Sequence, residues 1–171
     1  MRLAPTCALA ASLLLLALGC GREDPAPRPE PPVAKPSLPV ETVAASADGS
    51  VQEIVRGEVA RARDQGRPLL VYVGAKWCEP CQRFHEAARA GKLDAVFPGL
   101  RLVEFDLDRD RERLREAGYA SRMIPLFALP RADGTGSGEQ IEGSIKGDGA
   151  VDQIAPRLHK LLAGGGGETR D

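Results

Sequence analysis

Two cysteines, Cys78 and Cys81, are the side chains of this 171-residue sequence best suited to do chemistry. They stand in the run Trp77-Cys78-Glu79-Pro80-Cys81, after an apolar segment and at the expected start of a helix. Unpaired N–H groups and the helix dipole favour a thiolate at a helix N-terminus, so we expect Cys78 to be the nucleophile. Cys81 follows one helical turn later and would attack a mixed disulfide formed at Cys78. Trp77 can shield both thiols, and Pro80 costs no hydrogen bond in the first helical turn.

The same cysteine spacing also occurs as half of a zinc site. His85 lies four residues after Cys81 and would supply a third ligand, but the only other histidine is the distant His159. No second cysteine pair follows residue 20, so a closed shell of four ligands is hard to assemble. We therefore expect no bound metal and no cofactor. His85 is expected on the helix surface near Cys81, where it could also tune that thiol.

The first twenty residues indicate export. Met1-Arg2 forms a short basic start, residues 3–19 are mainly apolar, and Ala17-Leu18-Gly19 precedes Cys20. This pattern resembles a bacterial lipoprotein signal peptide, whose cleavage would leave an acylated Cys20 as the first mature residue. An ordinary secretory signal and an uncleaved anchor are the alternatives, although the apolar stretch is short for a membrane-spanning helix. The resemblance implies the periplasmic side of a bacterial membrane, and Gly21 favours the outer membrane.

Composition divides the rest of the chain into a linker, a domain and a tail. Residues 20–45 hold seven of the 14 prolines, which favour an extended spacer over a packed core. Residues 46–163 have the length of one domain with a single core, and residues 164–171 are expected to fray. In an exported protein, one close cysteine pair is more readily an exchanging pair than a structural clip.

Helices and strands are expected to alternate within this domain. Ser50 and Glu53 form a capping-box pattern, and the continuous apolar run at 69–73 predicts a central parallel strand that leads to the cysteines. Periodicity, turn residues and caps predict the remaining elements. The expected helices are 51–66, 78–90, 109–117 and 148–163, the last capped by Asp148, and the further strands are 101–107, 126–129 and 139–142.

This order of elements resembles the thioredoxin fold, an α/β fold with a central mixed sheet of about four strands flanked by helices. The likeness extends to Ile124-Pro125, where thioredoxins carry a cis-proline opposite the cysteines, and to Gly143, where they carry a glycine near the same surface. The resemblance implies a thiol–disulfide oxidoreductase that exchanges its Cys78–Cys81 pair with protein substrates. It also implies that the backbone of Ile124 binds an extended substrate segment.

The chain departs from thioredoxin close to the cysteines. Thioredoxin has a buried aspartate six residues before the first cysteine, and Tyr72 stands here. Alignment of the neighbouring strand puts Glu104 where thioredoxin has the lysine that pairs with this aspartate. We expect Glu104 to be a candidate proton acceptor for Cys81, hydrogen-bonded by the Tyr72 hydroxyl, with a solvent-facing Glu104 as the alternative. The charge of Glu79, in place of a common glycine, should oppose the thiolate that Lys76 and the helix terminus favour.

Neither the net charge nor the cysteine motif identifies the partners or the direction of electron flow. The formal net charge is −1, and both signs are interleaved at 108–113, unlike the one-signed patch of a nucleic-acid-binding protein. We expect a lipid-anchored monomer that acts on protein thiols or disulfides and receives electrons from a membrane protein. Reduction is slightly favoured, although the reduction potential decides the direction. The alternative is a non-catalytic module that binds a metal ion or a partner protein.

Overall fold

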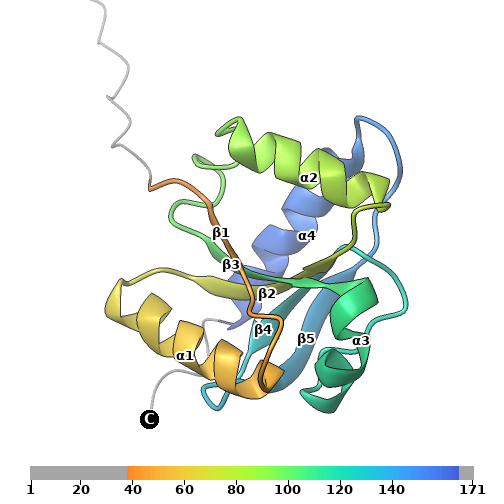
Figure 1. Ribbon diagram of the computed structural model, residues 1–171. Coiled ribbons are helices and arrows are strands. Elements are labelled where there is room, and N and C mark those ends of the chain that lie inside the picture. Colours follow the sequence, from red (N-terminus) through yellow and green to blue (C-terminus); the bar gives the residue numbers. More distant parts are fainter. Residues whose placement is uncertain (1–37, 166–171) are drawn as a thin grey trace, which may run out of the picture. The chain divides into compact units, whose positions relative to one another are not determined.

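The structure, a computed structural model, describes residues 38–165 of the chain. Its centre is a five-stranded mixed sheet with the order β1-β3-β2-β4-β5 (Figure 1). Strands β1, β3 and β2 run parallel, whereas β4 is antiparallel to β2 and β5 is antiparallel to β4. The strands are β1 at Glu41–Ala44, β2 at Leu69–Gly74, β3 at Arg101–Asp106, β4 at Leu126–Pro130 and β5 at Gly136–Glu142.

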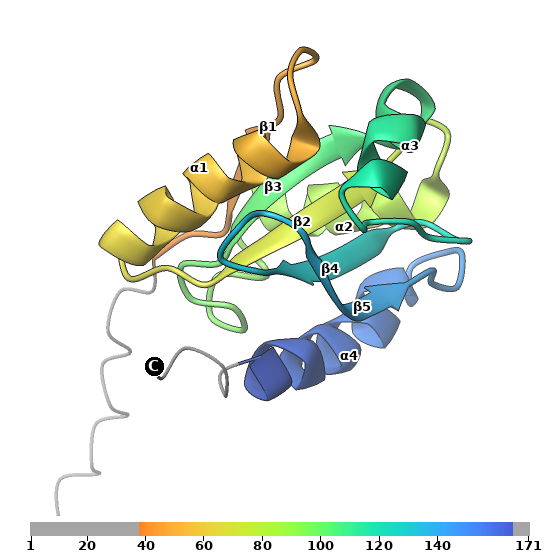
Figure 2. The same cartoon turned by 90° about the horizontal axis from the view of Figure 1, so that it is seen from below.

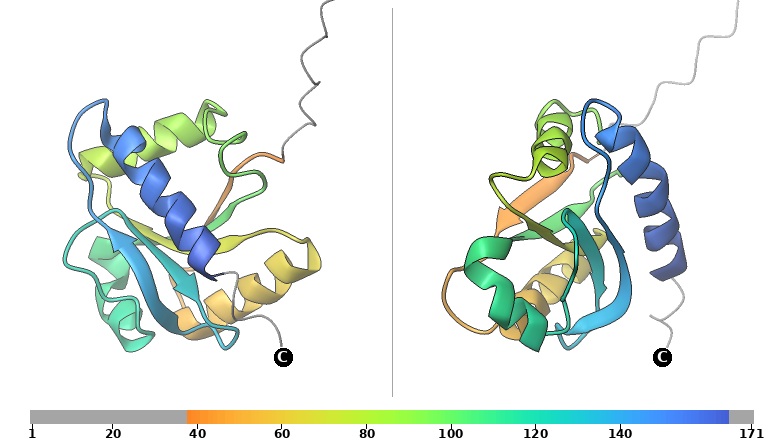
Figure 3. Two further views of the ribbon diagram at one scale, coloured as in Figure 1. Left: turned by 180° about the vertical axis from the view of Figure 1, so that it is seen from behind. Right: turned by 90° about the vertical axis from the view of Figure 1, so that its right-hand side faces the viewer.

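In this part of the chain, four helices cover the two faces of the sheet. They are α1 at Val51–Asp64, α2 at Glu79–Arg89, α3 at Leu107–Glu116 and α4 at Ala150–Gly164. Figure 2 shows α1 and α3 on one side of the sheet and α4 on the other, and Figure 3 shows α2 beside α4. Among residues 38–165, no helix combines the length and the apolarity that a membrane crossing requires.

The alternation of side chains along β2 produces two separate cores. Val71 and Val73 are buried in the cluster that contains side chains of α1 and α3. Leu70 and Tyr72 are buried in the opposite cluster, with side chains of α2 and α4. Because successive strand residues point to opposite faces, a continuous apolar run produces a strand that is buried on both sides. The central strand expected at 69–73 is therefore confirmed.

The helix caps follow the expectation at α1 but not at α4. The side chain of Ser50 accepts a hydrogen bond from the Glu53 N–H at 3.4 Å, so Ser50 caps α1. The expected cap of α4 by Asp148 is wrong, because the N-cap is Gly149 and has no side-chain hydrogen bond. The Asp148 carboxylate lies 3.5 Å from the guanidinium of Arg83 in α2 instead. This contact links α2 to the loop that precedes α4.

Strand β1 lies within the stretch expected to be linker. It pairs with β3 in parallel, with Glu41 opposite Arg101. The Arg101 guanidinium lies 2.6 Å from the carboxylate of Glu41 and 2.7 Å from that of Glu58 in α1. The sheet therefore has five strands instead of four and begins before residue 46. A four-residue edge strand after a proline-rich stretch has too little periodicity to be recognised, and its ion-pair partner Arg101 is 60 residues away.

Candidate active site

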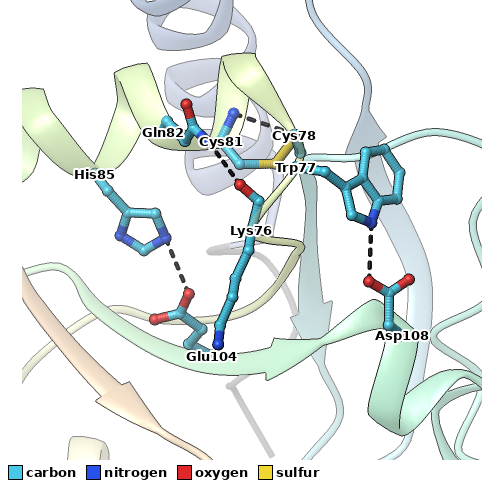
Figure 4. Close-up of a disulfide and its surroundings, with 8 residues drawn as sticks. All are labelled: Lys76, Trp77, Cys78, Cys81, Gln82, His85, Glu104 and Asp108. Carbon is cyan, nitrogen blue, oxygen red and sulfur yellow. Dashed lines mark hydrogen bonds and ion pairs between the residues drawn. A yellow bond between two sulfur atoms is a disulfide. The ribbon is translucent and has the colours of Figure 1, made fainter.

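Cys78 and Cys81 lie at the start of α2, just beyond the end of β2. Cys78 is the N-cap residue and Cys81 is in the first turn. The two residues form a disulfide with their Cα atoms 5.2 Å apart, and the Cys81 N–H donates to Cys78 Sγ at 3.3 Å (Figure 4). Only 4% of Cys78 and 2% of Cys81 is exposed. Position in the helix, rather than exposure, therefore distinguishes the two sulfurs, and the cap position of Cys78 favours a thiolate.

Hydrogen bonds from two helices hold the loop that precedes Cys78. The Trp77 indole donates from Nε1 to Oδ2 of Asp108 in α3 at 2.8 Å, and the ring remains 64% exposed. The side-chain amide of Gln82 in α2 donates to the Lys76 carbonyl at 2.5 Å (Figure 4). Asp108 belongs to the charge run expected to be a solvated helix face, so its contact with Trp77 is not apparent from the sequence.

The sheet topology brings Ile124 and Pro125 to the same end as the cysteines. Strand β4 is antiparallel to β2 with Leu126 opposite Val73, so β4 begins where β2 ends. The Ile124–Pro125 peptide bond is cis, as the resemblance implies. Ile124 also packs against the buried cluster that contains both cysteines.

Gly143 joins this end of the sheet through a close backbone contact. Its N–H donates to the Pro125 carbonyl at 2.9 Å. Gly143 has a φ of +68°, and a Cβ atom there would lie 3.1 Å from Cβ of Met123. Glycine therefore suits both the left-handed backbone and the tight approach. Gly143 thus lies beside Pro125, at the end of the sheet where β2 leads to Cys78.

Exposed apolar side chains adjoin all three segments of the site. Trp77, Met123 and Ile145 are 64%, 58% and 54% exposed. Trp77 precedes Cys78, Met123 precedes Ile124, and Ile145 follows two residues after Gly143. These side chains offer apolar contacts to a molecule that approaches the disulfide.

The Glu79 carboxylate, between the two cysteines, binds a backbone N–H group. Its Oε1 accepts a hydrogen bond from the Gly147 N–H, in the loop between β5 and α4, at 3.1 Å. The sequence suggests only an electrostatic effect on Cys78 for this carboxylate. In the folded chain, Glu79 also connects the start of α2 to the loop that follows Gly143.

Tyr72 occupies the buried strand position before the cysteines. Its ring packs edge-on against the His85 imidazole with centroids 5.1 Å apart, and also against Phe84 and Phe127. The hydroxyl is buried and has no hydrogen-bond partner within residues 38–165. Burial, and then the nearby charge of Glu104, raise the pKa of the hydroxyl far above its ordinary value. The expected hydrogen bond from Tyr72 to Glu104 is therefore wrong.

Glu104 pairs with His85 instead. Oε1 of Glu104 lies 2.9 Å from Nε2 of His85, and the two side chains are 32% and 18% exposed (Figure 4). Both line an open groove of about 810 Å³ that is also lined by Cys81. The sequence places each residue near the cysteines but does not predict the pair. Two features place these residues near each other. His85 follows Cys81 by four residues, and Glu104 lies opposite Tyr72 in the register of β2 and β3.

The described residues contain no group of three or more histidine, cysteine or acidic side chains placed to hold a metal ion. The imidazole of His85, the third ligand of the zinc alternative, bonds to Glu104. Cys78 and Cys81 bond to each other. The side chains of the site are therefore arranged for disulfide chemistry.

Comparison with known proteins finds thioredoxin-like sequence in this domain. A family model described as thioredoxin-like matches residues 52–132. A probable nucleoredoxin 3 from Oryza sativa subsp. japonica is 33% identical over 73 residues, which make up 41% of this chain and 15% of that relative. The chain thus matches only a small part of the length of the relative.

Two solved structures are similar to part of this chain. A disulphide isomerase from Xylella fastidiosa Temecula1 has 20% sequence identity and a TM-score of 0.48, over 70% of this chain and 93% of that one. A thioredoxin h from poplar has 21% identity and a TM-score of 0.47, over 75% of this chain and 97% of that one.

The family match includes part of the site. Residues 52–132 carry both cysteines, Ile124, Pro125 and the strands β2 and β4 that position them, whereas Gly143 lies beyond the match. The thioredoxin-like match therefore covers residues 52–132, and the Cys78–Cys81 pair within them is the cysteine pair of a thiol–disulfide oxidoreductase.

Proposed function

We propose that this protein reduces disulfide bonds of other proteins on the periplasmic side of a bacterial membrane, to which an acylated Cys20 anchors it. The observation that carries the redox part is the disulfide between Cys78 and Cys81 at the N-terminus of α2. Export and anchoring are supported by the sequence of residues 1–20, which lie outside the described residues.

The reaction consists of two thiol–disulfide exchanges. In the reduced protein, the Cys78 thiolate attacks one sulfur of a client disulfide, and the other client sulfur leaves as a thiolate and takes a proton from water. Cys81 then loses its proton and attacks Sγ of Cys78, which breaks the mixed disulfide and releases the second client thiolate. Two electrons have passed from the protein to the client, and the protein ends with the Cys78–Cys81 disulfide. A membrane electron-donor protein restores the dithiol.

Two features support an extended protein segment as the substrate. The backbone of Ile124, beside Pro125, offers the position at which the family binds such a segment. The exposed side chains of Trp77, Met123 and Ile145 adjoin this position and would supply apolar contacts. Backbone pairing with apolar contacts tolerates many client sequences, which suits an enzyme that acts on several proteins.

Insulin reduction and a redox titration test this proposal. With dithiothreitol as the electron source, we expect catalytic reduction of insulin by the wild-type protein and none by Cys78→Ala. In glutathione or dithiothreitol buffers, we expect a reduction potential near roughly −270 mV, typical of a reductant. A potential near about −120 mV would indicate an oxidant instead. Absence of turnover, with retained binding of a partner protein, would point to the non-catalytic module.

A further inference from the structure

The attack of Cys81 on Cys78 needs a proton acceptor, and Tyr72, the residue at the strand position before the cysteines, does not supply one. This requirement rests on the proposed function, in which the Cys81 thiol must lose its proton before it attacks Cys78. Cys81 is 2% exposed, and the nearby Tyr72 is also buried. The raised pKa of the Tyr72 hydroxyl keeps it protonated at neutral pH, so it cannot take a second proton from a thiol. The acceptor must come from another element.

The groove beside α2 contains such a group. His85 follows Cys81 by four residues on the same helix, so the two side chains share a helix face. Both residues line the groove of about 810 Å³, which is open enough for water to reach this face. The Glu104 carboxylate, from β3, holds the imidazole at 2.9 Å (Figure 4). The Tyr72 ring packs against the imidazole from β2.

The charges around this pair are balanced. Besides Glu104, the charged side chains along the groove are Lys76 before α2, Glu86 and Arg89 in α2, Asp106 in β3 and Arg109 in α3. Three basic and three acidic groups therefore face the groove. Strand β1 contributes Thr42 and Ala44, which carry no charge. The specific partner of the imidazole is Glu104, whose carboxylate lies 2.9 Å from Nε2 and fixes the orientation of the ring.

We propose that His85 accepts the proton of Cys81 during resolution and that Glu104 positions the imidazole. The proton passes through water in the groove from the Cys81 thiol to the neutral imidazole, which becomes an imidazolium paired with the Glu104 carboxylate. The Cys81 thiolate then forms a bond to Cys78 Sγ, the mixed disulfide breaks, and the client sulfur leaves with the electron pair of that bond. The imidazolium afterwards returns its proton to water in the groove.

The test follows the two exchanges separately in one reaction. In a full-length chain with Cys7→Ser and Cys20→Ser, only Cys78 and Cys81 remain of the four cysteines. The reduced protein is mixed with dithiobis-nitrobenzoate in a stopped-flow instrument. Attack by Cys78 releases a first coloured thiolate, and resolution by Cys81 releases a second. This leaving group needs no proton, so the second phase reports the deprotonation and attack of Cys81.

We expect His85→Gln to slow the second phase at neutral pH by about tenfold or more. General bases usually accelerate a reaction by more than this, about 100-fold to 10,000-fold. The deficit should shrink steadily as the pH rises toward 9, because a growing share of the thiol then ionises without an acceptor. The first phase should change less than twofold. Glu104→Gln should slow the second phase less than His85→Gln, and the double variant no more than His85→Gln alone. His159→Gln is the matched control, because His159 lies on α4 against Phe97 and does not line the groove.

Two results would overturn this assignment. One is an equal second-phase rate in the wild-type chain and His85→Gln from pH 6 to 9. The other is a slowing of His85→Gln by one constant factor at every pH, as expected for a structural role. Failure of the proposed function looks different, because the wild-type protein itself would then release no second thiolate or would not reduce insulin.

Discussion

The two cysteines differ in their relation to the amides of α2, and this difference assigns their tasks. Cys78 caps the helix and accepts the N–H of Cys81, whereas Cys81 sits inside the first turn. Cys81→Ala should therefore retain the nucleophile and accumulate mixed disulfides with client proteins. Cys78→Ala should accumulate none. Non-reducing electrophoresis followed by mass spectrometry of the trapped species measures both outcomes, and alkylation of Cys81 before Cys78 at neutral pH would contradict the assignment.

The effect of the unpaired Tyr72 hydroxyl on stability can be compared with that of a second buried tyrosine, Tyr119. Among residues 38–165 the Tyr72 hydroxyl has no partner, whereas the hydroxyl of Tyr119 donates to the Gly134 carbonyl at 2.9 Å. Removing an unsatisfied buried polar group relieves its desolvation cost, so Tyr72→Phe should raise the free energy of unfolding by about 1 kcal/mol. Tyr119→Phe breaks a hydrogen bond and should lower it by about 1 kcal/mol.

Urea unfolding of the oxidised protein at pH 7 measures both variants. The two tyrosines are almost equally buried, at 0% and 1% exposed. A difference in burial therefore does not account for a difference in stability between the two variants. A similar loss of stability in both variants would contradict the unpaired state of the Tyr72 hydroxyl and would indicate a bound water as its partner.

Residue types and spacing predict some members of the site better than others. Cys78, Cys81 and Pro80 lie in one contiguous motif, and Pro125 and Gly143 stand at characteristic places relative to the strands. The bond between His85 and Glu104 joins a helix to a strand and depends on how α2 lies across the sheet. Such a pair requires the packed structure, because neither residue is unusual within its own element.

At the scale of elements, a buried carboxylate fastens the chain between β1 and α1 to α3. Asp110 is fully buried and accepts hydrogen bonds from Arg109 at 2.7 and 2.8 Å and from Arg113 at 2.8 Å. Arg113 also donates to the carbonyls of Ser46 and Gly49, at 2.6 and 3.0 Å. Asp110 therefore orients the Arg113 guanidinium that holds this connection to α3.

The charge of Asp110 should make this connection sensitive to acid. Burial alone would raise the pKa of the carboxyl, but hydrogen bonds from Arg109, Arg113 and the Asp106 N–H outweigh it and hold the pKa below its usual range. A carboxyl with a lower pKa in the folded chain stabilises the fold above its unfolded pKa of about 4. This contribution disappears as the pH falls through the folded pKa.

Asp110→Asn should therefore lower the free energy of unfolding at pH 7 by about 3 kcal/mol, because it leaves two arginines without their buried counter-charge. The difference from the wild-type protein should shrink as the pH falls below about 4. Asp64→Asn, at the exposed end of α1, is the control and should change stability by less than about 0.5 kcal/mol. Urea unfolding at neutral and acid pH measures these values. An equal loss at both pH values would contradict the role of the charge.

Elements with strong periodicity are predictable, and elements held by distant contacts are not. The buried strand β2 and the amphipathic helix α1 follow directly from apolar spacing and a capping residue. Strand β1 depends on its pairing with β3 and on Arg101, which contacts both Glu41 and Glu58. A local sequence pattern contains neither contact, so a proline-rich neighbourhood leads to the wrong boundary.

At the scale of the whole molecule, the contacts just before β1 limit the length of the proposed spacer. The Leu38 and Pro39 carbonyls and the Val40 N–H already form hydrogen bonds with the domain, so residues 21–37 are available between Cys20 and the domain. A proline-rich segment in the polyproline II conformation rises about 3.1 Å per residue, so this segment would span about 50 Å. We infer that this reach gives the active site access to clients and to a membrane electron donor from a fixed attachment point.

The anchor itself is open to a direct test, because a second cysteine in the leader serves as its control. Cys20→Ser removes the sulfur that would carry a diacylglyceryl group and should block lipoprotein-type cleavage. Cys7 lies inside the proposed signal peptide, so Cys7→Ser should leave processing unchanged. In a bacterial host with lipoprotein processing, mass spectrometry should find an acylated Cys20 at the N-terminus of the wild-type protein and of Cys7→Ser. An unmodified terminus at another cleavage site would reject the lipid anchor and leave export by an ordinary signal.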